Sequence, residues 1–267
     1  MTHLRPWAAA RQHPVAVAVV VGFIAVQATW MVEAMCPRMS ITECLIAAII
    51  LVAGASMLAI VVRAGWLAAT TTRALAALPR APMPQSLRAA ARRAGIARLR
   101  CLAGTDLTAF CAGLLRPCVY VTTATAKLNT NELDAVLAHE AAHARRRDPL
   151  RRLLTRAAAD VMFWFPLLRW WLRTHVENAE IHADKAAIEH AGRQGLAAAM
   201  LAAAAQPPVA VPAMGGATET RIAHLLGEDL PQRRPPRSLV VLSLLGAVGA
   251  VWLVMCLGQG VLAAIGI

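Results

Sequence analysis

The residue pattern best suited to chemistry is His139-Glu140-Ala141-Ala142-His143. On an α-helix, residues i and i+4 lie one turn apart on the same face, so the two histidines can bind one metal ion. Zinc suits this spacing, and it lowers the pKa of a water molecule to about 7. Glu140 can then take a proton from that water as the general base. The segment therefore predicts a zinc-dependent hydrolase with about one Zn²⁺ per chain.

A catalytic zinc needs a third protein ligand and an open fourth position. The best candidate is Glu180, in the run Glu180-Ile181-His182-Ala183-Asp184. On a helix, Asp184 follows Glu180 by one turn on the same face. We expect its carboxylate to accept a hydrogen bond from the outer nitrogen of a zinc-binding histidine and so to fix that histidine's tautomer.

Several roles at this site stay open. Three other residues are alternative third ligands: His182, His175 and Glu177. The group that stabilises the transition state is not identified by any motif. The only tyrosine, Tyr120, and His182 are candidates for it. The strand near Val119–Val121 is expected to bind a peptide substrate by edge addition.

The elements around these motifs can be read from local patterns. A helix from about residue 131 to 146 should carry the histidines, since Asn129 and the residues after it suit a helix start. Residues 107–123 predict two short strands around a turn at Gly113–Pro117. Residues 65–100 predict a helix leaving the membrane, a turn containing prolines, and a basic helix. The expected fold class is α+β, mostly helical.

Three uncharged apolar runs predict membrane-spanning helices, at residues 14–32, 44–62 and 238–267. Each reaches the roughly 18–20 residues that a bilayer core requires. Hydrophobic residues make up 58% of the chain and charged residues 16%, whereas soluble domains average roughly 45–50% and 25%. This composition excludes a disordered chain, a coiled coil and a small disulfide-stapled protein. We expect a transmembrane hairpin at 1–64, a metallopeptidase domain at 65–230 and a transmembrane helix at 231–267.

Basic residues near the runs predict the orientation. Arg5 and Arg11 precede the first run, the next loop has only Arg38, and Arg63 and Arg73 open a strongly basic middle segment. The positive-inside rule then predicts a multi-pass protein of the plasma or inner membrane. Its N-terminus and catalytic domain would face the cytosol, and its C-terminus the outside. The net charge of +12 fits a basic face near anionic lipid. No direct nucleic-acid binding is expected, because no matching motif is present.

The apolar segment 161–172 is too short to span a membrane. If it did cross once, Glu180 would lie on the opposite side from His139. We therefore expect a shallow, membrane-proximal or re-entrant element. The arginines between residues 145 and 152 are expected to contact lipid headgroups, and Asp148 to pair with one of them. Cys36 and Cys44 fall in or beside the predicted outer loop, where a disulfide can form.

The order of these motifs resembles that of the BlaR/MecR-type membrane metallopeptidases, the β-lactam sensor-transducers, and their sensorless relatives. The resemblance covers roughly residues 100 to 260 and rests on five segments: Phe110 to Val121, Leu137 to Asp148, Phe163 to Pro166, Glu180 to Asp184, and Arg221-Ile222 before a final membrane span. It implies a zincin-like (gluzincin) endopeptidase domain facing the cytosol. It implies zinc ligands at His139, His143 and Glu180, with Glu140 as the general base. It also implies a substrate, a cytosolic winged-helix repressor of the BlaI/MecI kind.

The sequence departs from the sensor-transducers in two respects. It has two predicted spans before the catalytic domain where they have three, and no penicillin-binding domain before Ile267, so direct β-lactam sensing is not expected. HtpX-type quality-control proteases share H-E-x-x-H and E-x-x-A-D, which makes them an alternative, and a non-catalytic membrane signalling scaffold is another. No motif indicates the inducing signal or the oligomeric state.

Overall fold

The computed structural model describes residues 40–205 and 234–265. The expected span at 14–32, Cys36 with its expected disulfide, and residues 206–233 lie outside the described residues. The chain forms two compact units, and the larger one, Leu58–Ser243, contains every candidate site residue. The domain limits expected from the sequence stay predictions.

Two described helices are long and apolar enough to cross a membrane: α2 (Ile41–Ala77) and α8 (Arg237–Ile265). Large apolar side chains such as Ile50 and Val62 are exposed on α2, as expected for a helix solvated by lipid. At about 1.5 Å per residue, the 37 residues of α2 extend for about 55 Å. That exceeds the roughly 30 Å of a bilayer core, so the helix is long enough to continue beyond the membrane.

The larger unit contains a three-stranded sheet made of β1 (Leu99–Leu102), β2 (Ala109–Ala112) and β3 (Cys118–Thr122). The strand order is β1-β3-β2, with β1 parallel and β2 antiparallel to β3. The hairpin expected within 107–123 is confirmed. The prediction that the strand near Val119–Val121 accepts substrate at its edge is wrong, because β3 is central and both of its edges are already paired.

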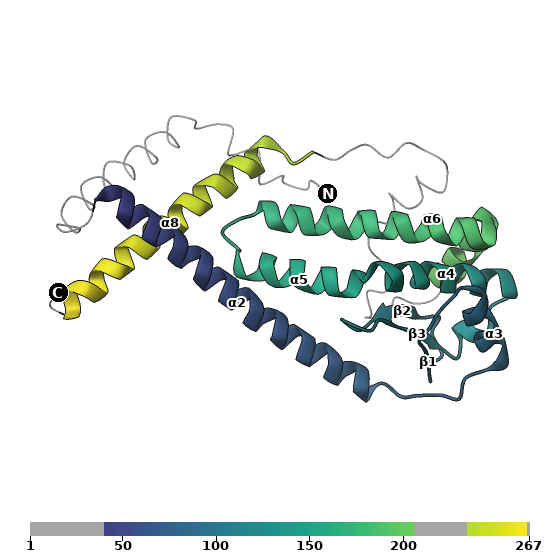
Figure 1. The fold of residues 1–267 in the computed structure, drawn as a ribbon. Coiled ribbons are helices and arrows are strands. Elements are labelled where there is room, and N and C mark those ends of the chain that lie inside the picture. The colour runs from purple at the N-terminus through teal and green to yellow at the C-terminus, as the bar shows by residue number, and fades with distance from the viewer. Residues whose placement is uncertain (1–39, 206–233, 266–267) are drawn as a thin grey trace, which may run out of the picture. The chain divides into compact units, whose positions relative to one another are not determined.

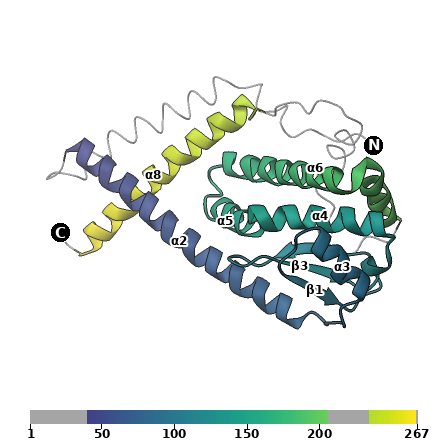
Figure 2. The same cartoon turned by 45° about the vertical axis from the view of Figure 1, so that its right-hand side comes forward.

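Helix α4 (Thr130–Arg146) occupies the centre of this unit, with the sheet and α3 (Gln85–Arg93) on one side and α6 (Leu167–Ala204) on the other (Figures 1 and 2). It matches the helix expected at 131–146. A capping box begins it: the Asn129 side chain accepts from the Glu132 backbone N–H, and the Glu132 side chain accepts from that of Asn129. The fold is thus α+β and mostly helical, as predicted.

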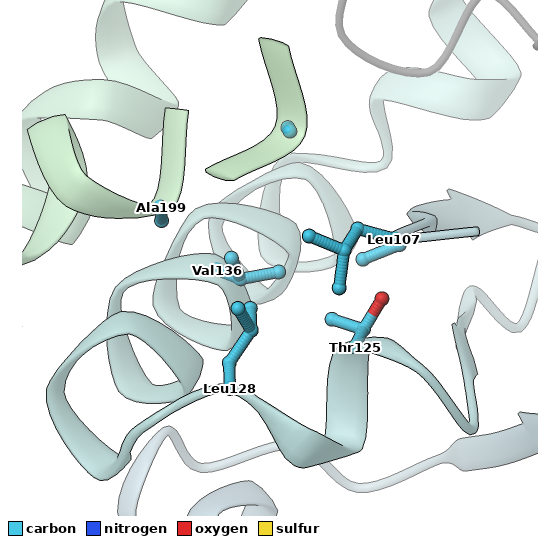
Figure 3. A pocket seen from close by; sticks show the side chains of 7 residues that line it. Leu107, Thr125, Leu128, Val136 and Ala199 are labelled. Carbon is cyan, nitrogen blue, oxygen red and sulfur yellow. The ribbon is translucent and has the colours of Figure 1, made fainter. Parts of the chain in front are cut away.

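The core lies between the sheet and the two helices α3 and α4. Val119 and Val121 on β3 and Leu87 on α3 are completely buried against Leu137 of α4. A small apolar cavity of about 10 Å³ remains beside Leu107, near the short 3₁₀ helix η2 (Thr125–Lys127) (Figure 3). At most one water molecule fits such a space, so this cavity is part of the core packing and not a ligand site.

The apolar segment at 161–172 forms the turn of a helical hairpin. Helix α5 (Asp148–Val161) ends there, and α6 begins at Leu167. The reversal returns the chain to α4, which confirms that the segment does not separate Glu180 from His139. The Asp160 carboxylate binds Arg63 of α2 at 2.7 Å, which fixes the end of α5. Proximity of this turn to the membrane stays a prediction.

Helix α6 contains a sharp kink at Gly192, where φ is 77° and ψ is 163°. Only glycine adopts this conformation without strain. After the kink, Leu196 and Ala199 are buried against α4. A Cβ atom on Gly195 would lie 2.9 Å from Nδ2 and 3.2 Å from the backbone oxygen of Asn131, so the close approach of the two helices favours glycine here.

Candidate metal centre

Three buried side chains converge between α4 and α6. His139 and His143 project from one face of α4, and Glu180 projects from α6 toward them. Their exposed fractions are 0%, 6% and 4%. Small residues on α6 permit this approach, since Ala179, Ala183 and Ala187 are buried at four-residue spacing beside Glu180.

The separations within this group suit one tetrahedral metal ion. The two histidine Nε2 atoms are 3.2 Å apart, and each lies 3.5 Å from one Glu180 carboxylate oxygen. Bonds of about 2.0–2.1 Å around a tetrahedral zinc place neighbouring ligand atoms roughly 3.3 Å apart. Two nitrogens and one carboxylate, with a fourth position left for water or substrate, are also a usual donor set for catalytic zinc. The residues present therefore fit Zn²⁺.

Each of the two histidines has a carboxylate at its Nδ1 atom. Nδ1 of His139 lies 3.0 Å from Oδ1 of Asp184, and Nδ1 of His143 lies 2.8 Å from Oδ2 of Asp148. A carboxylate beside Nδ1 favours the proton on that nitrogen, which leaves the Nε2 lone pair directed at the metal position. Asp184 lies where the sequence predicted it.

Asp148 was not recognised as a partner of His143 from the sequence. Arg147 adopts the left-handed conformation with φ 55°, which ends α4, and α5 then continues beside α6 on the same side as α4 (Figures 1 and 2). Helix α5 begins with Asp148 and Pro149, and the buried Asp148 carboxylate contacts His143 across this break between the two helices. The expected pairing with an arginine is weak by comparison, since Arg146 Nε lies 3.9 Å from Asp148 Oδ1. The Arg147-Asp148-Pro149 sequence after H-E-x-x-H is the local signal for this break.

The electrostatics of the group keep Glu180 ionised. Burial raises its pKa, but the contact with His139 and the charges of His139, His143 and Arg152 together lower the pKa to about 2. The Arg152 guanidinium, from α5, lies 2.5 Å from Glu180 Oε1. A metal-binding carboxylate has to be deprotonated, so this environment prepares Glu180 for that role at neutral pH.

Glu140 is 2% exposed and lies between the two histidines on α4. The edge strand β2 lies near Glu140. Burial, with a smaller contribution from the Glu140 carboxylate, raises the pKa of the Cys111 thiol on β2 to about 12. Cys111 therefore stays protonated at neutral pH and does not compete as a metal ligand.

Other candidate residues from the sequence lie elsewhere. Among the described residues, the metal-binding group includes none of His175, Glu177 and His182. His182 is exposed, whereas His175 is half-buried against the Trp171 ring at 5.6 Å, and burial lowers its pKa. The Tyr120 ring stacks on Phe110 at 5.1 Å. It lies on the face of the sheet opposite Val119 and Val121, and therefore points away from α4.

Comparison with known proteins agrees with this geometry. No curated protein matches the chain. The family model described as BlaR1 peptidase M56 matches residues 8–228, most of the chain, including both histidines and Glu180. The resemblance inferred from the motifs is confirmed, and the chain belongs to the BlaR1 peptidase M56 family.

Proposed function

We propose that this protein is an integral-membrane zinc endopeptidase. One observation carries the proposal: His139, His143 and Glu180 are buried together at 3.2–3.5 Å, and each histidine has a carboxylate at its outer nitrogen. Carboxylate–histidine pairs of this kind orient zinc ligands and raise their basicity. A merely structural metal site would not require the buried Glu140 carboxylate between the two histidines.

Each polar residue has a specific role in peptide hydrolysis. His139, His143 and Glu180 would hold the zinc ion, which would supply polarisation of the scissile carbonyl and a lowered pKa for the attacking water. Glu140 accepts the proton of that water and later delivers it to the leaving amine. Asp148 and Asp184 hold the histidine rings in orientation, and the ionised Glu180 completes the ligand set.

Arg152 is the best-placed cation for the negative charge that develops on the substrate oxygen. Its guanidinium reaches Glu180, which places it beside the metal position. Its Nε is buried and has no hydrogen-bond acceptor within the described residues. A buried donor without an acceptor is costly, so a substrate oxygen at this position would satisfy it. This assignment takes the place of Tyr120 and His182 as the transition-state group.

The free edge of the sheet supports an extended substrate. In the described part of the chain, β2 pairs with β3 on one side only, and its Cys111 lies near Glu140. An extended peptide added to β2 would gain main-chain hydrogen bonds while its scissile bond reaches the metal. Such binding favours segments that are unstructured or readily unfolded.

The proposed substrate is a cytosolic protein. The kinship to BlaR1-type peptidases supports a cytosolic repressor of the BlaI/MecI kind, cleaved by a domain on the inner side of the membrane. The basic segment that follows α2 supports that orientation, with the C-terminus outside. Reporter fusions at both termini test the orientation.

The decisive variant is Glu140→Gln, with Glu189→Gln as a matched control, because Glu189 is an exposed carboxylate on α6. We expect the purified Glu140→Gln protein to keep about one zinc and to lose cleavage of labelled casein by about 10²–10⁴-fold. The control should behave as the parent does.

Full cleavage by Glu140→Gln would refute the mechanism. If the parent binds zinc but cleaves neither casein nor a co-expressed repressor, the non-catalytic scaffold is the better description. Cleavage of misfolded membrane proteins but not of the repressor would favour the quality-control alternative.

A further inference from the structure

A second cavity lies on the reverse side of the catalytic helix. It has a volume of about 280 Å³ and is lined by residues 95–98, the Arg116–Pro117 turn, and Ala141, Ala144 and Arg145 of α4. Pockets for small molecules begin at roughly 300 Å³, so this one suits a small ligand. Ala141 and Arg145 each follow a zinc-site histidine by two positions, which is about 200° around the helix. The cavity is therefore separate from the metal centre.

Three arginines from three different segments surround this cavity. Arg98 precedes β1, Arg116 lies in the β2–β3 turn, and Arg145 lies in the last turn of α4. No acidic side chain lines the cavity among the described residues. Within that same part of the chain, none of the three guanidinium groups makes an ion pair or a side-chain hydrogen bond, unlike Arg63, Arg93 and Arg152, which bind carboxylates.

Two backbone motifs hold the segments around the cavity. Helix α3 ends in a Schellman motif, in which Gly95 N–H donates to Arg92 O and Ile96 N–H donates to Ala91 O. Gly113, with φ 104°, closes the β2–β3 turn, where a Cβ atom would lie 3.0 Å from the Arg116 carbonyl oxygen. The segments that carry Arg98 and Arg116 are thus fixed by their own hydrogen bonds and sterics, and the cavity is formed in advance of any ligand.

Three cations around one cavity need an explanation. Arg145 alone complements the carbonyl end of α4. That reason does not extend to Arg98 and Arg116, which come from other segments and add like charge beside it. The three exposed guanidinium groups place like charge around one cavity, and an anion bound there would offset that charge.

We propose that this cavity binds a phosphate-bearing small anion on the back of the catalytic helix. Guanidinium forks match phosphate oxygens in a bidentate way, and three of them suit a doubly charged group. The apolar side chains of Ile96, Pro117 and Ala141 form the remaining wall, which accommodates an uncharged part of the ligand. The phosphate has two sources, a soluble phosphate compound or a phospholipid headgroup. A ligand here contacts the residues directly after Glu140 and His143 in α4.

The test is calorimetric binding to the full-length protein, which does not depend on peptidase activity. One arm titrates inorganic phosphate into protein in phosphatidylcholine nanodiscs. The other titrates dioctanoyl phosphatidylglycerol into protein in an uncharged detergent, with dioctanoyl phosphatidylcholine as the reference lipid. The variant carries Arg98→Gln, Arg116→Gln and Arg145→Gln. A charge-matched control carries Arg73→Gln, Arg156→Gln and Arg173→Gln, which are exposed arginines outside the cavity.

We expect saturable binding of at least one probe, near one per chain, that weakens by about tenfold or more in the cavity variant and not in the control. Binding of inorganic phosphate identifies a soluble source, and binding of phosphatidylglycerol alone identifies a headgroup. The proposal is overturned if neither probe saturates, if the cavity variant keeps its affinity, or if the control weakens equally. Circular dichroism and size-exclusion profiles establish that both variants are folded.

Discussion

Replacement of Asp148 by asparagine tests how much the carboxylate at the outer nitrogen of His143 contributes to metal binding. The Asp148 carboxylate is 1% exposed, and its Oδ2 lies 2.8 Å from His143 Nδ1. Burial raises its pKa, but the hydrogen bond and charge of His143, with Arg146 and Arg152, lower the pKa overall. The side chain is therefore an anion at neutral pH, and Asp148→Asn removes a full charge while keeping the shape.

The expected effect is on zinc affinity. Loss of an orienting carboxylate typically costs about 10–100-fold in metal affinity, which corresponds to about 1.4–2.7 kcal/mol. We expect a loss in the upper part of this range. The variant removes the Asp148 anion but keeps the nearby positive charges of Arg146 and Arg152, so the site becomes less favourable for a cation. The assay is competition for zinc between the detergent-purified protein and a chromophoric chelator.

Asp134→Asn is the matched control. Asp134 lies on the same helix and is ion-paired with Arg93 at 2.7 Å, away from the metal-binding group. Its loss should leave zinc affinity unchanged and cost at most about 1 kcal/mol of stability. Unchanged zinc affinity in Asp148→Asn would refute the orienting role. Equal weakening in both variants would show that the loss reflects general destabilisation of α4.

Three further outcomes are expected. Arg152→Gln should lower kcat by about 10²–10³-fold with zinc content and KM nearly unchanged, and a fall confined to KM would assign Arg152 to substrate binding instead. Gly192→Ala should cost about 1–3 kcal/mol, seen as a lower Tm, because alanine is strained at φ 77°; an unchanged Tm would mean that the kink is not required. The folded-state pKa of Glu180 is lowered from 4.5 to about 2, so its contribution to the stability of the metal-free protein is complete above about pH 4.5 and is lost as the pH falls toward 2. Acid titration of the helical circular dichroism signal checks this, and Glu180→Gln should flatten that part of the profile.

Local sequence patterns predicted a large part of this protein. Helical geometry alone places His139 and His143, at i and i+4, on one face of α4. It likewise places Glu180 and Asp184 on one face of α6. The helix start at Asn129 and the hairpin within 107–123 depend on caps and turns, which are also local. The apolar runs that became α2 and α8 follow from length and composition.

Other features depend on contacts between distant segments. The order β1-β3-β2 places β3 in the centre and leaves β2 as the free edge beside Glu140, and no pattern within one strand determines its neighbours. Arg152 reaches Glu180 across 28 residues because the α5–α6 hairpin folds back. Helical periodicity assigns residues to faces within one element. Only the packing of α4, α5 and α6 determined which faces meet, because that choice is made by the burial of the whole unit.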